Sequence, residues 1–452
     1  MDSTQGTAAR LFPRGTTPLA LATAFAALGH FVTLSVLYGF IMEAFGLSPE
    51  EGHAAWGLYT AATVVFYVAG GVWGDFGGHR RNLIIGPSIT IAALFLLLIT
   101  PDSGDAGAGA GLLVFFSLSA FALGHALFVV ACGALAAHLY DGDGCRVPLV
   151  GAYTLLHVAG NAGVMLLAPF AVVELLGDQL GLSRDESQRA LFALAAQPAI
   201  GALIVAAVTK RTFAAAELGA RAKAAAKDAS PLDDGAVAYR RSAIGLLVAA
   251  AALGFWAYHA ATDGAYDLAS RLDTVDGDWS SVLQPLSAAI VVFLAPIAVI
   301  VYGRMRRGDG RVATAGVAVV GAALIGVGLT ILLAASAMMP DAPSEFAPPW
   351  LEDTPSVAWP IAALVLVSLG EILFIPLVST LFMGLAPRRL RGLFIGFALA
   401  SAGVIVFFTR LVDDAVDGIP LTASAALALA AAIACAALLA VVGTVFRSKS
   451  AA

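Results

Sequence analysis

WPIAALVLVSLGEILFIPLVSTLFMGLA, residues Trp359 to Ala386, contains a single ionisable side chain, Glu371, near its middle. A helix needs about 20 apolar residues to span a lipid bilayer, so this stretch is long enough to do so. The whole chain has 452 residues, of which 60% are hydrophobic and only 12% are charged. A soluble protein could not cover that much apolar surface, whereas lipid can surround it. The composition therefore predicts an all-α polytopic membrane protein.

About twelve apolar runs of this kind occur along the chain. They cover approximately residues 17–45, 54–75, 83–100, 110–139, 147–176, 188–209, 242–265, 283–304, 312–338, 358–386, 392–412 and 421–446. The longest cytoplasmic loop, KRTFAAAELGARAKAAAKDASPLDDGAVAYRR, follows the sixth run and carries seven basic residues. We predict an N-terminal six-helix bundle over 1–209, a basic cytoplasmic linker over 210–241 and a C-terminal six-helix bundle over 242–452. The section AAAELGARAKAAAK of the linker is predicted to form a surface helix.

The basic residues are distributed unevenly between the two sides of the membrane. With the N-terminus in the cytoplasm, the Lys and Arg residues that fall on the opposite side are Arg184, Arg189, Arg271 and Arg410. Cytoplasmic loops of membrane proteins carry an excess of Lys and Arg, so this bias indicates the orientation. We expect a multi-pass protein of the cell (inner) membrane with both termini in the cytoplasm.

A glycine-rich basic loop, GGVWGDFGGHRR at residues 70–81, follows the second run. Its glycines permit a tight turn and close approach of the backbone. Asp75 can cap or pair at a helix end, and Arg80 and Arg81 can anchor the cytoplasmic face; a generic basic turn explains them as well. Counted from Gly71, the loop resembles the major facilitator superfamily signature G-x-x-x-D-x-x-G-x-R-R. That resemblance implies two six-helix halves with substrate between them near mid-membrane.

Further segments resemble, in chain order, the proton-dependent oligopeptide transporter (POT) family. They are ALGHALFVVACGALAAHLYDGDGCR at 122–146, Asn161-Ala162-Gly163, Phe255-Trp256-Ala257 and GEILFIPLVSTLFMGLAPRRLRG at 370–392. Each match alone is short, but together they cover most of the chain. The sequence is identified as a divergent member of that family, and the resemblance implies a proton-coupled symporter of peptides.

The chain departs from the family at several polar positions. The charged positions of the family's first helix fall on His30, Thr33 and Leu34, and its fifth-helix Tyr falls on His157. The two cations that would hold a peptide carboxylate, a first-helix Arg and a fourth-helix Lys, are both missing. Of the polar core that the resemblance implies, this sequence keeps Glu371, Asn161 and, by position, Gln284.

Glu371 is costly to place in a span, because insertion scales assign about 2.5 to 3.5 kcal/mol to a mid-span Asp. It is therefore expected to face the bundle interior and to be protonated or to have a cationic partner. No Lys or Arg lies at comparable depth, so that partner is a histidine or the positive charge of a substrate. A carboxyl group that alternates between a proton and a cation couples the two. The alternative is a permanently protonated Glu371 bonded to a backbone carbonyl.

Histidines are further proton-binding candidates, because imidazole titrates near neutral pH. Those within predicted spans are His30, His125, His157 and His259. We predict a proton-coupling role for His30, and a substrate-binding role for His157 and Asn161, which share a helix face. Each histidine is equally explained as a neutral residue that is hydrogen-bonded between helices. No spacing of ligand residues indicates a metal site.

The remaining candidates are aromatic residues and one acid at the membrane edge. Tyr38 and Trp256 are predicted to line the substrate cavity together with Gln284, although packing also explains the two aromatic residues. Asp263 lies at the outer end of the seventh run. It is predicted to be a proton-entry group or an outer gate, with an ordinary interfacial Asp as the alternative.

Together these features predict a secondary transporter, coupled to protons, that moves a small peptide-like or amine-bearing solute by alternating access. The missing cations predict weak transport of ordinary di- and tripeptides, because a buried carboxylate would lack its strongest partner. A non-transporting membrane sensor or scaffold with the same fold is the alternative. We expect no enzyme activity, no cofactor other than the proton gradient, no nucleic-acid partner, and a monomer in the lipid bilayer.

Overall fold

The computed structural model describes residues 12–45, 47–100, 108–140, 149–165, 177, 179–227, 234–276, 280–305, 310–338, 357–415 and 421–450. Every regular element in these ranges is a helix, which confirms the predicted all-α class. The elements are α1 (Thr16–Phe45), α2 (Pro49–Gly77), α3 (His79–Leu98), α5 (Ala108–Tyr140), α6 (Leu149–Met165), α8 (Arg184–Lys227), α9 (Asp234–Asp276), α10 (Ser280–Met305), α11 (Gly310–Met338), α12 (Ala358–Leu385), the 3-10 turn η2 (Arg388–Leu390), α13 (Arg391–Ala415) and α14 (Leu421–Ser450).

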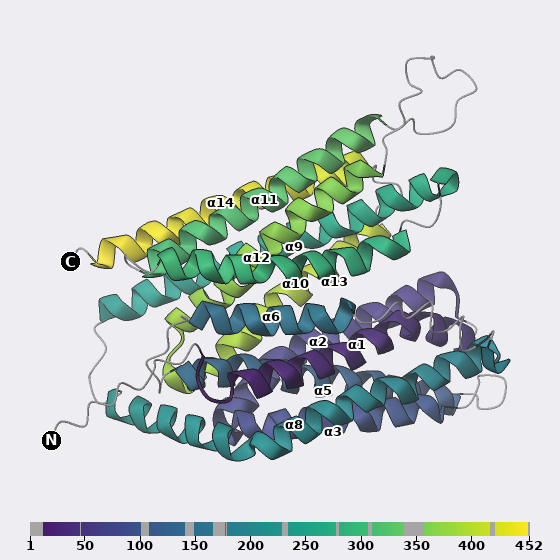
Figure 1. Cartoon of the computed structure of the whole chain (residues 1–452), viewed down its shortest axis with the longest axis horizontal. Coiled ribbons are helices and arrows are strands. Elements are labelled where there is room, and N and C mark those ends of the chain that lie inside the picture. The colour runs from purple at the N-terminus through teal and green to yellow at the C-terminus, as the bar shows by residue number, and fades with distance from the viewer. Residues whose placement is uncertain are drawn as a thin grey trace.

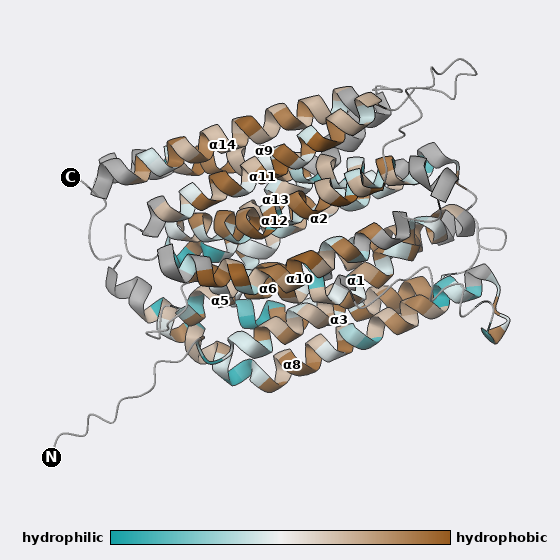
Figure 2. Cartoon of the chain, turned by 45° about the horizontal axis from the view of Figure 1, so that its top comes forward, coloured by the Kyte–Doolittle hydropathy of each residue, from teal (hydrophilic) through white to brown (hydrophobic). Residues whose placement is uncertain are grey.

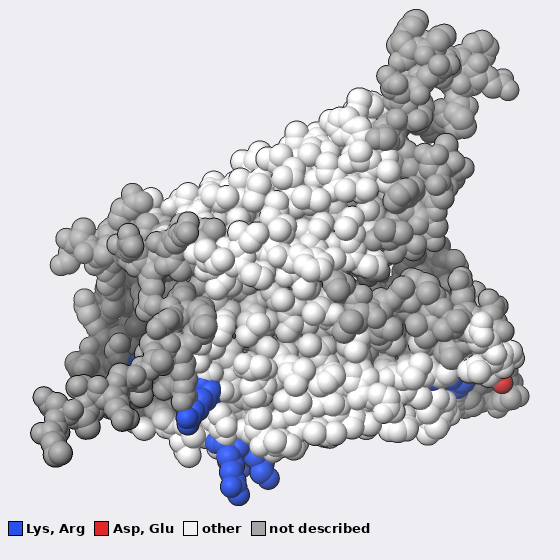
Figure 3. All heavy atoms as spheres, in the orientation of Figure 1, with Lys and Arg blue, Asp and Glu red and all other residues white. Residues whose placement is uncertain are grey.

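Within the described ranges, nine helices are long and apolar enough to cross a membrane, and α10 contains a shorter apolar segment, Pro285–Ile300. Figure 2 shows hydrophobic residues along most of the helix lengths. In Figure 3 the basic side chains gather near the left end of the visible face, a few charges mark the right end, and the middle is uncharged. An uncharged band between charged ends is what a bilayer requires, so the chain is a multi-pass membrane protein.

The helices form two groups of consecutive elements (Figure 1). In the first group α1, α2, α3, α5, α6 and α8 pack against one another, and in the second group α9 to α14 do so. α1 begins and α14 ends at the same end of the molecule. The sequence AAAELGARAKAAAK continues α8 to Lys227 instead of forming a separate helix, and α9 already begins at Asp234. The domain boundaries at residues 209 and 242 stay predictions.

A close crossing of α11 and α12 fixes the position of Glu371 in the bundle. α11 and α12 touch at Gly321 and Gly370, where a Cβ on Gly370 would lie 2.7 Å from the Gly321 carbonyl oxygen. Only a residue without a side chain permits this approach, which is typical of small residues in membrane helix packing. Because Gly370 precedes Glu371, the crossing fixes the turn of α12 that carries the acid.

The two groups meet through α2 with α13 and through α6 with α10 and α12. The contact of α2 with α13 runs through three glycines of α13, which face Gly71, Tyr67 and Val64 of α2. A Cβ on Gly392 would lie 2.5 Å from the Gly71 carbonyl oxygen. The backbones of α2 and α13 are therefore in direct contact at the end of the bundle where α2 ends and α13 begins.

Candidate functional site

A cavity of about 430 Å³ lies between the two groups of helices, and residues of α1, α5, α6, α9, α12 and α13 line it. Its volume lies within the range of small-molecule sites, which is roughly 300 to 1,000 Å³. The ionisable side chains among its described lining residues are His30, His125, Cys132, Tyr153, His157, Tyr258 and Glu371. These lining residues include no Lys or Arg and one acid. The cavity therefore combines an apolar surface with a few polar groups, as ligand sites do.

Glu371 and His157 form a close contact across the two groups of helices, which is an ion pair when the imidazole is protonated. The His157 Nε2 atom of α6 lies 2.9 Å from Oε1 of Glu371 on α12. The glutamate side chain is 4% exposed, and the imidazole, at 16%, keeps access to the cavity. A buried carboxylate without a cation would be strongly destabilising. The partner of Glu371 is thus the histidine, one of the alternatives that the sequence left open.

The surroundings of this pair leave one carboxylate oxygen without a hydrogen-bonding partner among the described residues. This oxygen is Oε2 of Glu371, and it is buried. The hydroxyl of Tyr258 on α9 lies close enough to the carboxylate to interact with it. On the other side, Nδ2 of Asn161 donates to the His157 carbonyl oxygen at 3.1 Å and lies 3.4 Å from His157 Nε2. Asn161 therefore lies beside the imidazole, one helical turn away, and its amide is bonded to the backbone of α6.

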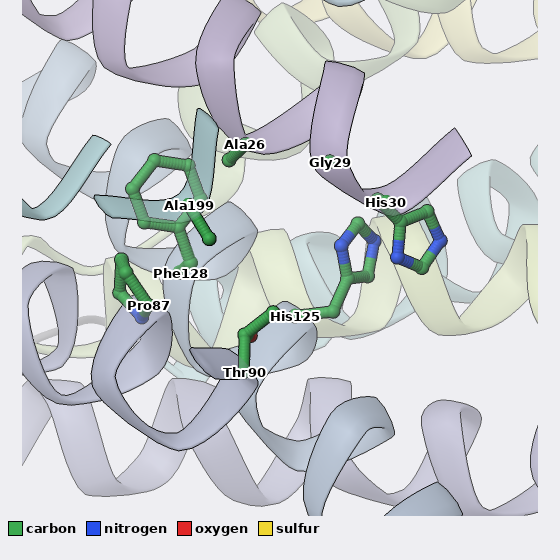
Figure 4. Close-up of a pocket in the computed structure, with 8 residues that line it drawn as sticks. All are labelled: Ala26, Gly29, His30, Pro87, Thr90, His125, Phe128 and Ala199. Carbon is green, nitrogen blue, oxygen red and sulfur yellow. The ribbon is translucent and has the colours of Figure 1, made fainter. Parts of the chain in front are cut away.

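His30 also faces the cavity, but its neighbour is His125 and not Glu371. The two imidazole rings stack with 3.6 Å between their centroids and 15° between their planes. A second cavity of about 20 Å³, enough for one water, lies behind the rings and is lined by Thr90, Pro87 and Phe128 (Figure 4). Nδ1 of His30 is buried without a partner in the described part of the chain. Two positively charged imidazolium rings at this distance would repel each other, so a charge on one ring disfavours a charge on the other.

The other predicted site residues lie elsewhere in this conformation. Tyr38 packs edge-to-face on Trp56, with ring centroids 6.2 Å apart, and is not among the residues that line the cavity. Trp256 is half-buried against the large hydrophobic core, which contains residues of both groups, and does not line the cavity either. Asp263 is exposed, near Tyr266 on α9. Gln284 lies in α10, and its side chain falls outside the described residues. The roles of these four residues stay predictions.

Residues 70–81 join the two groups at the end of the bundle that we call the signature-loop end. This segment is mostly helical: α2 runs to Gly77, Gly78 makes the turn with φ of 101°, and α3 begins at His79. The carboxylate of Asp75 accepts hydrogen bonds from the backbone N–H groups of Gly392, at 2.8 Å, and Leu393, at 2.9 Å. These amides belong to the first turn of α13, where free N–H groups and the helix dipole favour an anion.

Histidines and arginines extend this connection. His79 Nε2 lies 3.1 Å from the same Asp75 carboxylate. Arg391 at the start of α13 donates to the Ala137 carbonyl oxygen on α5 at 3.1 Å and lies 3.3 Å from His138 Nδ1. The predicted anchor Arg80 instead contacts Glu217 of α8, through its backbone N–H at 3.1 Å and its Nε at 3.9 Å. Arg81 is exposed. Asp75 and Arg391 therefore hold the two groups together at the signature-loop end.

Asp75→Asn is expected to loosen the signature-loop end. The amide keeps one accepting oxygen but loses the charge that favours the α13 N-terminus, which costs about 1 to 2 kcal/mol, or roughly a five- to thirtyfold shift toward the open state. Cys132 lines the central cavity and serves as reporter once Cys145 and Cys435 are replaced by Ala. Its labelling by an impermeant thiol reagent applied from the signature-loop side should accelerate. An unchanged labelling rate would show that Asp75 does not hold this end closed.

Several residues of the site have only weak signals in the sequence. His79 lies four residues after Asp75, which on a helix places both on one face, but the Gly78 turn hides this spacing. His138 and Arg391 stand 253 positions apart, and no local pattern connects them. His125 is visible as a histidine in a predicted span, but its stacking on His30 depends on how α1 and α5 meet.

Comparisons with known proteins agree with this architecture. The family model described as Major Facilitator Superfamily matches residues 19–409. A search of curated proteins found no match. Among solved structures, a POT family transporter in complex with a thioalcohol-conjugated peptide has a TM-score of 0.66 at 14% identity, over 95% of this chain and 96% of that one.

Two further structures show the same fold. The peptide transporter POT in complex with sulfate matches with a TM-score of 0.61 at 18% identity, over 96% of both chains. A POT family transporter in complex with 5-aminolevulinic acid matches with a TM-score of 0.62 at 14% identity, over 96% of this chain and 95% of that one. These identities establish similarity of fold, and they fit a divergent relative. Because the family model covers most of its length, the chain belongs to the Major Facilitator Superfamily, and its fold resembles that of the POT transporters.

Proposed function

We propose that this transporter is proton-coupled and moves a small amine-bearing or peptide-like solute by alternating access between the two groups of helices. The observation that carries the proposal is the buried Glu371 in the central cavity, paired with His157 of the opposite group. An intramembrane acid with a titratable partner is typical of proton and substrate pathways. A scaffold that only kept the fold would have no use for this costly pair.

Alternating access requires that the cavity open to one side while the other is sealed. Direct backbone contact of α2 with α13, together with the Asp75 bonds to Gly392 and Leu393, closes the signature-loop end. When these contacts are released, this end opens, and the central pair then faces the solution on the signature-loop side. By the distribution of basic residues, the signature-loop end faces the cytoplasm of a cell (inner) membrane, with both termini on that side.

The charges of the cavity favour an amine over a carboxylate. Oε2 of Glu371 is buried with an unused accepting capacity, and the described lining residues include no Lys or Arg to hold a carboxylate. A carboxylate taken into this cavity would lose its water and find only histidine side chains as potential cations, of which His157 already pairs with Glu371. Peptide amides, amino amides and amine-bearing metabolites or drugs therefore fit better than ordinary di- and tripeptides. One structural neighbour binds a conjugated peptide and another binds 5-aminolevulinic acid.

Proton flux in proteoliposomes that contain a pH-sensitive dye tests this function. Peptide amides and simple amines should drive proton movement, and matched zwitterionic dipeptides should drive little. Glu371→Gln should reduce the flux at least roughly thirtyfold, because loss of one member of a buried charge pair costs about 2 to 5 kcal/mol. His259→Gln is the matched control, since His259 also lies within a span but does not line the cavity.

Two results would contradict the proposal. Micromolar binding of zwitterionic dipeptides would show that the charge argument is wrong. A folded protein that moves no compound of the panel would favour the sensor or scaffold. The expected monomer, and the expected lack of a cofactor or nucleic-acid partner, stay predictions.

A further inference from the structure

The central ion pair holds one proton between two groups that both exchange protons with water. Nε2 of His157 lies 2.9 Å from Oε1 of Glu371, and the imidazole is partly open to the cavity. Burial makes an unneutralised carboxylate unfavourable here. With Glu371 ionised, the cation that neutralises it is therefore the protonated imidazole. With Glu371 ionised and His157 protonated, the empty site is neutral.

The other titratable groups around the pair add no permanent charge. From α1 and α5 the cavity receives His30, His125 and Cys132, and from α6 it receives Tyr153. Tyr258 of α9 interacts with the carboxylate, and Tyr266 of the same helix lies within its electrostatic influence. α12 contributes Glu371 as its one acid, and the lining residues of α13 are apolar. The charge balance of the described site is thus set by Glu371, His157 and whatever enters the cavity.

We propose that the proton on His157 and the charge of a monocationic amine exclude one another at Glu371, so that binding of the amine releases a proton and transport exchanges the two. This rests on the proposed function and gives the direction of its coupling. The ammonium group replaces the imidazolium as counterion of the carboxylate. The Nε2–H bond of His157 breaks, its electron pair stays on the ring, and the proton leaves through cavity water.

The exclusion follows from comparing the total charge of the site with and without the proton on His157. If His157 kept its proton, an ammonium and an imidazolium would share one carboxylate in a largely apolar cavity, and the two cations would repel each other. Release of the proton restores a neutral site, and imidazole gives up its proton readily near neutral pH. Oε2 of Glu371 is buried without a partner among the described residues, so it can accept from the ammonium once the ligand displaces the groups that cover it, while Oε1 contacts His157.

The charge of the substrate then determines the movement of the proton. An amine without a carboxylate adds one positive charge, expels the proton, and crosses the membrane against it. A zwitterion brings its own negative charge, which accepts a hydrogen bond from the protonated His157. The proton then stays in the site and moves with the substrate. The same pair of residues thus supports exchange for a monocation and joint movement for a zwitterion.

Calorimetry on the purified full-length protein measures this directly. Alanyl-alanine amide, a monocation, and alanyl-alanine, a zwitterion, are titrated in two buffers with different ionisation enthalpies, at pH values from 5.5 to about 8. The expected release is about one proton per bound amide, with an affinity that rises up to tenfold per pH unit. The zwitterion, at concentrations high enough to bind, should release none. Amide binding without proton release overturns the exchange but leaves the amine transporter intact.

Variants assign the proton to His157. His157→Gln keeps a hydrogen-bond donor near Glu371 but removes the imidazole, so any proton that the amide still releases comes from Glu371, and the pH range of the release should differ from that of wild type. His259→Gln, the control, should behave as wild type. If His125→Gln removed the release instead, the proton would come from the stacked pair of histidines and the proposal would be wrong. If alanyl-alanine amide did not bind to wild type at all, both the exchange and the proposed amine specificity would fail.

Discussion

Gly71→Val should abolish transport and leave the signature-loop end unable to close. At this position α2 and α13 touch through backbone atoms: a Cβ on Gly71 would overlap the carbonyl group of Gly392 and approach the Leu393 Cα to 2.9 Å. No side chain can rotate away to make room, so the helices must separate. Separation also pulls Asp75 from the amides of Gly392 and Leu393. Overpacking costs about 1 to 3 kcal/mol, so the closed state becomes up to roughly a hundredfold rarer.

Two measurements separate loss of closure from misfolding. In the variant that retains Cys132, labelling from the signature-loop side should reach its maximal rate, because this cysteine lines the central cavity. Gly316→Val in α11 is the matched control, since a Cβ there meets nothing within 4 Å. The control should transport and label like wild type. Normal transport by Gly71→Val would mean that the contact of α2 with α13 is not part of the cycle.

The spans could be predicted from the sequence because each depends on local composition. A run such as 359–386 is apolar over a length that only a bilayer or a large core accommodates. The glycines and Asp75 of the signature loop were likewise visible as a pattern. The atoms that Asp75 contacts were not, because they lie 317 and 318 positions away in the chain. Contacts of that kind depend on how the two groups of helices dock.

For the site as well, local sequence singled out the residue, and helix docking determined its partner. The cost of a charge in a span singled out Glu371 from its position alone, but three kinds of partner satisfied that cost. The geometry of α6 and α12 selects His157, while His30 meets His125 within the first group. Tyr38 and Trp256 were predicted to line the cavity but do not line it in this conformation. A span has several faces, and the sequence does not show which of them borders the cavity. Here Tyr38 packs on Trp56 instead.

At pH 7, His157→Leu is expected to destabilise the protein more than Glu371→Met does, although each removes one member of the same pair. The difference lies in what the remaining group does. In water a carboxyl group ionises near pH 4.3 and imidazole near pH 6.5, so at pH 7 neutralising a carboxylate costs about 4 kcal/mol and neutralising an imidazolium costs a few tenths. Without His157, Glu371 stays as an uncompensated charge or takes up a proton at that cost. Without Glu371, His157 simply loses its proton.

Thermal unfolding in detergent at pH 7 and pH 5 tests this, with His157→Leu/Glu371→Met as the third variant. The loss in free energy of unfolding that His157→Leu causes, relative to wild type, should shrink from about 4 kcal/mol at pH 7 to about 1 kcal/mol at pH 5. The reason is that protonating a carboxylate becomes easier as the pH falls. The double variant should regain most of the loss at both pH values, since replacing a whole buried pair by apolar residues is often neutral. A loss independent of pH would instead indicate that Glu371 is always protonated. In that case the 2.9 Å contact with His157 would be an ordinary hydrogen bond, and Glu371 would carry no charge for a substrate to neutralise.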